Sequence, residues 1–302
     1  MLREITAVAH QDQAEGLRKL LARSSARVVA VVGAQNTLGT TSVVINLAET
    51  WARSGMDVLI LDEHLSQNNV ANTLALKPRY DLLNVIRGDK SLYEAILSGS
   101  NSIQILQVAR AMKAIPMMQT KERERLLELL TQLASGSDVV LVDAAAREEN
   151  SVCASLSGNE PLVLILNPTA QGITESYAMI KQMALINGRK NFDIIINKTK
   201  NESEAKKIFN NIEQVAWQNL QVRLEYMGYI PADEKLKRAT QLCRSVVEVF
   251  PGAASSLEFS ILAKNLVGSK STMDEEVSGL KMVMQRLIRQ AGSLNNVVSA
   301  IT

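Results

Sequence analysis

The sequence predicts an α/β fold in which a mostly parallel sheet is covered by helices on both faces. Two observations indicate this fold. Short, nearly continuous runs of Val, Ile and Leu recur along the 302 residues, and helical patterns separate these runs. Strands that are apolar on both sides are typical of parallel sheets buried between two helical layers. The hydrophobic content of 46% is enough for one large domain or two modest ones.

The apolar runs predict the strands, and the segments between them predict the helices. The strands are 28–32, 58–61, 103–106, 139–142, 162–166, 194–196 and 224–226. The principal helices are 41–53, 121–134, 173–186, 202–217 and 255–266. Because strand and helix alternate, we expect crossover connections and ligand-binding loops at the carboxyl ends of the strands.

Two helical appendages flank this α/β body, which spans residues 26–267. Residues 1–25 contain a helical pattern from Asp12 to Arg23, followed by a short polar connection. Residues 268–302 contain a polar linker and then an amphipathic pattern from about Glu275 to Ala291. We expect the appendages to be the parts that meet partners.

Composition and charge exclude several classes of protein. The net charge of +2 provides no overall field for nucleic acid. Two distant cysteines, Cys153 and Cys243, indicate a reducing compartment, and they show no zinc-site spacing with His10 or His64. No segment has the pattern of a signal peptide or the ~20 apolar residues of a membrane span. The expectation is a cytoplasmic protein.

The segment between the first strand and the next helix has the position of a phosphate-binding loop but lacks its charge. Such a loop follows G-x-x-x-x-G-K-[ST], in which backbone N–H groups cradle the phosphates and the lysine adds positive charge. Here Ala34 stands for the first glycine and Thr40 for the lysine, while Gly39 and Thr41 are kept and Ser42 follows. The main stabilisation of a transferring phosphoryl group is therefore missing.

Residues 27–267 resemble the MinD/ParA superfamily of deviant P-loop ATPases, which carry K-G-G-V-G-K-T. Aligned by Gly39 and Thr41, this chain has Gln35 at the lysine that crosses to the other subunit of an ATP-bound dimer. The resemblance implies ATP or ADP with Mg²⁺ as cofactor, Thr41 and Asp62 as metal ligands, and a homodimer. The residues themselves assign no cofactor, since both lysines are replaced.

Two more motifs of that superfamily are altered. The D-x-D motif reads Asp62-Glu-His64, so His64 replaces the second carboxylate. The D-T/S-x-x-G motif reads Asp143-Ala-Ala-Ala-Arg147, so Arg147 replaces a glycine. One hypothesis is that the guanidinium of Arg147 reaches back to Asp62 or Asp143 and fills the phosphate position.

Two adenine-side positions are kept: Asn197, at the end of a strand, and Pro231, in a G-x-I-P-x-D loop. Three outcomes stay open, namely ATP turnover, weak nucleotide binding and a body that works without nucleotide. The missing charges favour the last, a pseudo-ATPase with no assigned catalytic residue. The degenerate nucleotide-binding set is Ala34, Gln35, Gly39, Thr40, Thr41, Ser42, Asp62, His64, Asp143, Arg147, Asn197 and Pro231.

The N-terminal segment narrows the resemblance. Asp12-Gln-Ala-Glu-Gly-Leu-Arg18 matches the D-Q-A-x-x-L-R motif of the flagellar-number regulators FlhG, FleN and YlxH. The resemblance implies that this helix activates FlhF, a GTPase of the signal-recognition-particle type. The alternative is an amphipathic helix that packs on its own domain. The predicted partner-binding set is Asp12, Gln13, Ala14, Leu17 and Arg18.

The C-terminal pattern presents an apolar stripe with basic flanks, formed by Leu280, Val283, Met284, Leu287 and Ile288. Such a stripe suits an interfacial membrane helix, and the resemblance implies one at this end. The alternatives are a helix docked on the body and a dimer contact. Peripheral contact with the inner face of the membrane is therefore one expectation for the location of the protein.

Together these observations predict a regulator of flagellar number or placement that acts through protein interactions. An FlhF-type GTPase is the expected partner, and flagellar switch components or a flagellar transcription regulator are further candidates. One rival is an ATP-binding MinD/FlhG ATPase with residual hydrolysis and membrane switching. Another is a ParA-like positioning protein that binds DNA, but the basic residues alternate with acids, which favours a solvated surface. Those basic residues are Lys206, Lys207, Lys235, Lys237 and Arg238.

Overall fold

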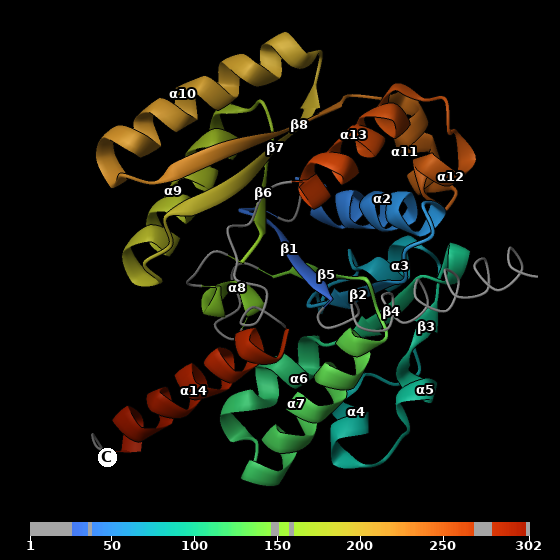
Figure 1. The fold of residues 1–302 in the computed structure, drawn as a ribbon, viewed down its shortest axis with the longest axis vertical. Coiled ribbons are helices and arrows are strands. Elements are labelled where there is room, and N and C mark those ends of the chain that lie inside the picture. Colours follow the sequence, from blue (N-terminus) through green and yellow to red (C-terminus); the bar gives the residue numbers. More distant parts are fainter. Residues whose placement is uncertain (1–25, 36–37, 146–150, 157–159, 269–279, 300–302) are drawn as a thin grey trace, which may run out of the picture.

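A sheet of eight strands in the order β3-β4-β2-β5-β1-β6-β7-β8 forms the centre of the structure (Figure 1). The computed structural model describes residues 26–35, 38–145, 151–156, 160–268 and 280–299. All the strand pairs are parallel except β3 with β4. The strands are β1 (Arg27–Gly33), β2 (Val58–Asp62), β3 (Leu97–Ser98), β4 (Gln104–Gln107), β5 (Val139–Ala144), β6 (Leu162–Leu166), β7 (Asn191–Thr199) and β8 (Arg223–Pro231).

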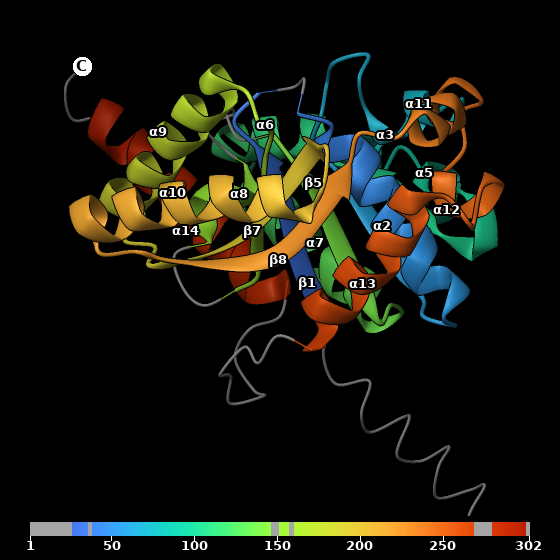
Figure 2. The same cartoon turned by 90° about the horizontal axis from the view of Figure 1, so that it is seen from above.

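Helices cover both faces of this sheet, as Figures 1 and 2 show. One layer contains α2 (Thr40–Arg53), α3 (Val70–Thr73), α11 (Glu234–Gln241), α12 (Val246–Val249) and α13 (Ala254–Gly268). The other layer contains α4 (Leu82–Arg87), α5 (Leu92–Ala95), α6 (Ala109–Ala114), α7 (Thr120–Ser135), α8 (Val152–Ser155), α9 (Ala170–Ile186), α10 (Glu202–Leu220) and α14 (Leu280–Ser299). Two short 3-10 turns are η1 (Ser100–Ser102) and η2 (Ile115–Met117).

The period of two along each strand divides the apolar side chains between two cores. In β1, Val28, Ala30 and Val32 join the core on one face, while Val29 and Val31 join the core on the other. This arrangement confirms the predicted fold class. Each apolar run that predicted a strand overlaps one, although β4 begins one residue after the predicted start at Ile103, and the two-residue strand β3 was not predicted.

Two strands extend beyond the apolar runs that predicted them. β7 and β8 both extend into polar residues on either side of the predicted runs. The pairing shifts register between Ile194 and Ile195, and the two strands stay hydrogen-bonded on both sides of this shift. The segment from Gly228 to Pro231, expected as a loop, therefore ends β8. Pro231 is tolerated there because β8 is an edge strand, where a missing N–H costs little.

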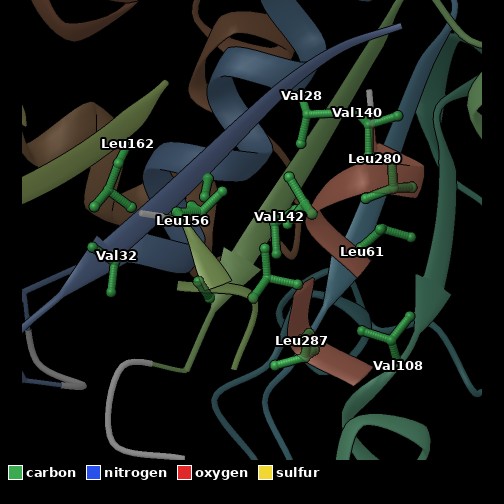
Figure 3. Close-up of a cluster of buried hydrophobic side chains, with 14 of the residues drawn as sticks. Val28, Val32, Leu61, Val108, Val140, Val142, Leu156, Leu162, Leu280 and Leu287 are labelled. Carbon is green, nitrogen blue, oxygen red and sulfur yellow. The ribbon is translucent and has the colours of Figure 1, made fainter. Parts of the chain in front are cut away.

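The C-terminal helix α14 packs its apolar stripe into the body, against η2, α7 and α8. Leu280, Val283, Met284 and Leu287 are at most 1% exposed, and Ile288 packs beside them. Figure 3 shows Leu280 and Leu287 among side chains of the strands. The sequence left three roles open for this stripe: membrane binding, docking on the body and a dimer contact. The structure shows docking on the body, so the stripe is not available to a membrane in this state.

An ion pair beside the apolar stripe of α14 also joins this helix to the body. Arg286 pairs with the carboxylate of Glu160, which is 3% exposed. None of the helices within the described residues is long and apolar enough to cross a bilayer. The N-terminal appendage, with Asp12, Gln13, Ala14, Leu17 and Arg18, lies outside the described residues.

Truncation of Leu287 to Ala should destabilise the whole body by about 2–5 kcal/mol, because the side chain is fully buried in the core. The matched control is Lys281→Ala, at an exposed position one residue into the same helix, which should change stability by less than about 0.5 kcal/mol. Urea unfolding of the full chain measures both. Equal midpoints for the two variants would contradict the docking of α14.

Candidate functional site

The loops that follow β1, β2, β5 and β7 meet at the carboxyl edge of the sheet, where open α/β sheets bind ligands. Asp62 ends β2, Asp143 is the last residue but one of the neighbouring β5, and the two are register partners. Thr41 lies in the first turn of α2, directly after the loop. The structure thus brings the predicted loop and the two aspartates to one edge.

Thr40, at the position of the phosphate-binding lysine, is turned into the protein. The residue is 7% exposed, and its Oγ1 lies 2.6 Å from where a Cβ on Gly33 would be. A longer side chain at position 33 would therefore collide with Thr40. The lysine position contributes neither a charge nor a side chain that reaches out of the loop.

Asn197 contacts the loop from β7, which lies two strands from β1 in the sheet. Its Nδ2 donates a hydrogen bond of 2.8 Å to the carbonyl of Leu38. A Cβ on Gly39 would lie 2.9 Å from the same nitrogen, and Gly39 has a φ of 85°, so both space and backbone conformation favour glycine there. The adenine-side asparagine predicted from the sequence is therefore part of the structure that supports the loop.

The two buried aspartates accept hydrogen bonds from the protein itself. The Oδ2 of Asp143 accepts from Thr41 Oγ1 at 2.7 Å. The two carboxylate oxygens of Asp62 accept from the backbone N–H groups of His64, at 3.0 Å, and Val70, at 2.9 Å. Burial raises the pKa of Asp62 to about 7, and the charge of Asp143 adds to the rise.

His64 places its ring beside Asp143. The distance from His64 Nε2 to Asp143 Oδ1 is 3.4 Å, which is an ion pair when the imidazole is protonated, and neither of these two buried atoms makes a hydrogen bond within the described residues. Burial alone would lower the pKa of His64. The contact with Asp143 and the charges of Asp62 and Glu63 outweigh that effect and raise the pKa. His64, which replaces the family's second carboxylate, is therefore shifted towards its protonated, positively charged form.

Glu63 is a site residue that the sequence analysis missed. Its carboxylate is 3% exposed and accepts from Ala145 N at 3.1 Å, Ser151 Oγ at 2.6 Å and Val152 N at 2.8 Å. Burial raises the pKa of Glu63, and these three hydrogen bonds oppose the rise. The sequence feature that could have indicated Glu63 is its position, because it is a carboxylate directly after β2, a strand that is buried along its whole length. Glu63 joins the end of β2 to both sides of residues 146–150.

Most of the predicted nucleotide set lies along this edge. The described members are Ala34, Gln35, Gly39, Thr40, Thr41, Ser42, Asp62, His64, Asp143 and Asn197. Pro231 lies on β8, one strand beyond Asn197 and paired in register with Thr199. Arg147 lies outside the described residues, so its proposed reach to the aspartates stays a hypothesis.

Removal of the Glu63 side chain in Glu63→Ala should cost about 3–5 kcal/mol of unfolding free energy, because three buried donors lose their acceptor. Ser151→Ala is the matched comparison, since it removes one of the three donors and should cost about 1 kcal/mol. Chemical denaturation of both variants gives the two values. A cost for Glu63→Ala no larger than that for Ser151→Ala would show that the carboxylate does not join these segments.

Comparison with known proteins identifies relatives over most of the chain. No family model matches it. It is 30% identical over 240 residues to the antiactivator FleN of Pseudomonas aeruginosa, covering 80% of this chain and 86% of FleN. It is 22% identical over 284 residues to the flagellum site-determining protein YlxH of Helicobacter pylori, covering 89% of this chain and 92% of YlxH.

Solved structures with a similar fold include MinD proteins. The MinC:MinD cell division protein complex of Aquifex aeolicus gives a TM-score of 0.61 at 21% identity, covering 80% of this chain and 96% of the other. MinD of Pyrococcus horikoshii with Mg-ADP also gives 0.61, at 20% identity and with the same coverage. These likenesses support the fold, and the identity to FleN supports the family. The chain therefore belongs to the FlhG/FleN type of the MinD/ParA superfamily.

Proposed function

We propose that this chain regulates flagellar number or placement through protein interactions, with a MinD-like body that works without ATP turnover. One observation carries the proposal. Thr40, at the position of the phosphate-binding lysine, is buried, and Asp143 contacts His64. The relatives named antiactivator and site-determining protein supply the process. The geometry of the site supports the loss of turnover.

The contacts at the sheet edge support a body that is stable without nucleotide. In an active phosphoryl-transfer site, a metal ion and a lysine balance the phosphates and the acidic residues. Here Asp143 is paired with Thr41 and His64, and Asp62 with two backbone N–H groups. The loops of the site are therefore held by one another.

The N-terminal helix is the part that we propose activates an FlhF-type GTPase. Its motif, Asp12 to Arg18, includes Gln13, a polar side chain that could orient water or charge in the partner's site. The segment joins the body at Ala26, at the amino end of β1, whereas the degenerate loop follows the carboxyl end of β1. The attachment point and the degenerate loop lie at opposite ends of β1, which supports our proposal that partner activation does not require an intact ATP site.

Gln13→Ala should lower the stimulation of a purified FlhF-type GTPase by roughly tenfold or more, because the polar group offered to the partner's site is lost. Glu15→Ala is the matched control, since position 15 is a variable position of the D-Q-A-x-x-L-R motif. The measurement is phosphate release by the GTPase at saturating concentrations of the full chain. Unchanged stimulation by Gln13→Ala, at an unchanged melting temperature, would contradict this mechanism.

A second candidate function is residual ATP hydrolysis with membrane switching. It is favoured by the retention of Thr41, Asp62 and Asn197 at the edge of the sheet. We do not extend a DNA-binding function to the chain, since Lys206 pairs with Glu202 at 2.8 Å and Lys237 lies 3.7 Å from Glu234.

Calorimetric titration with Mg-ATP and Mg-ADP separates the scaffold from the ATPase. No heat is expected at millimolar nucleotide, because the lysine position provides no charge for the phosphates. Measurable turnover that Asp62→Ala abolishes would instead favour the ATPase. The same titration of Thr40→Lys shows whether the lost lysine is what limits binding.

A further inference from the structure

Helix α13 presents apolar side chains to solvent along the side that faces away from the sheet. Leu257 is 58% exposed, Ile261 48% and Val267 38%, whereas Phe259 and Leu262 of the same helix are fully buried. Leu257 and Ile261 are four residues apart, so they are neighbours on one face of the helix. A pair of this kind forms a ridge into which the apolar face of a second helix packs.

The backbone that carries this pair is fixed to the body. Helix α13 packs against β8 and α2. Trp51 Nε1 donates a hydrogen bond of 3.2 Å to the carbonyl of Ala263, and Asn265 Nδ2 donates one of 2.8 Å to the carbonyl of Met227. Docking on the exposed side of α13 therefore requires little further ordering of that helix.

The attachment point of the N-terminal segment lies beside the last turn of α13. The segment joins the body at Ala26, and the next residue, Arg27, donates a hydrogen bond of 2.8 Å from Nη1 to the carbonyl of Val267. Only two residues connect the predicted helix, Asp12 to Arg23, to Ala26. A connection of that length spans at most about 11 Å. The predicted helix is therefore tethered next to the carboxyl end of α13.

The length and the spacing of the tethered helix match the exposed side of α13. Twelve helical residues extend over about 18 Å, and the distance along α13 from Leu257 to Val267 is about 15 Å. Leu17 and Leu21 are four residues apart, as are Leu257 and Ile261. Because both helices run toward the junction at Ala26 and Val267, side-by-side packing would place one leucine pair against the other apolar pair.

We propose that the N-terminal helix docks on α13, with Leu17 and Leu21 against Leu257 and Ile261. Leu17 belongs to the D-Q-A-x-x-L-R motif, so the same face of the helix serves its own body and the GTPase in turn. The docked state withholds the motif from the partner. This consequence rests on the proposed function, since it takes the Asp12–Arg18 helix to be the part that activates the GTPase.

Hydrogen exchange of the full chain, followed by mass spectrometry, tests the docking without any GTPase. A free helix of twelve residues is marginal in water, so the amides of residues 12–23 should be protected only when docked. They should exchange about tenfold faster in Leu257→Ser/Ile261→Ser than in the wild type. The matched control is Leu185→Ser/Ile186→Ser, which removes an apolar pair of α9 that is 69% and 73% exposed. This control should leave the exchange of residues 12–23 unchanged.

Leu21→Ser removes the contact from the other side and leaves the D-Q-A-x-x-L-R motif intact, so it should cause the same loss of protection. Equal exchange of residues 12–23 in the wild type and in Leu257→Ser/Ile261→Ser would overturn the proposal. Wild-type protection that disappears on dilution would also overturn it, because a second copy of the chain, rather than its own segment, would then cover α13.

Stimulation of the GTPase supplies the second measurement. If docking withholds the motif about tenfold, Leu257→Ser/Ile261→Ser should reach half-maximal stimulation at roughly one tenth of the wild-type concentration, with the same maximal rate. An unchanged concentration would contradict the competition between α13 and the GTPase. Failure of the proposed function is distinguishable, because it concerns Gln13→Ala in the GTPase assay, whereas the exchange experiment contains no GTPase.

Discussion

Two aspartates buried side by side constrain the whole carboxyl edge of this sheet. Asp62 and Asp143 are register partners at the carboxyl ends of neighbouring strands, one residue from the end in the case of Asp143, and neither is exposed to solvent. Like charges placed so close and so far from water are costly unless partners balance them. The start of α2, the turn after β2 and the segment after β5 each contribute donors to these acids or to Glu63. The described parts of these segments are therefore held by the need to balance the buried acids.

Much of the fold and part of the site could be predicted from the sequence. The strands were recognisable because both of their faces are apolar, and Gly39 with Thr41 located the loop before a helix. Glu63 was missed because its partners, Ala145, Ser151 and Val152, are more than eighty residues away along the chain. The docking of α14 could not be predicted for a different reason, since the same apolar stripe satisfies a membrane and a protein core equally well.

The structure separates two kinds of role within one chain. The edge that would hold nucleotide in an active relative is occupied by contacts among its own residues, with Thr40 buried and Asp143 paired. The N-terminal segment joins the body at the opposite edge, beside Ala26. Such an arrangement lets the ATP-site motifs change while the fold and the attachment point of the N-terminal segment stay the same. Loss of phosphoryl chemistry is then compatible with retention of a regulatory fold.

The burial of α14 has a consequence for how the chain is made. Leu280 and Leu287 share one core with Val28, so roughly 250 residues separate partners that must be packed together. Synthesis proceeds from the amino terminus, and the apolar surface beneath α14 therefore stays uncovered until residues 280–288 have left the ribosome. During that interval the nascent chain presents aliphatic side chains to the cell, which makes it a natural client for chaperones that bind exposed hydrophobic segments.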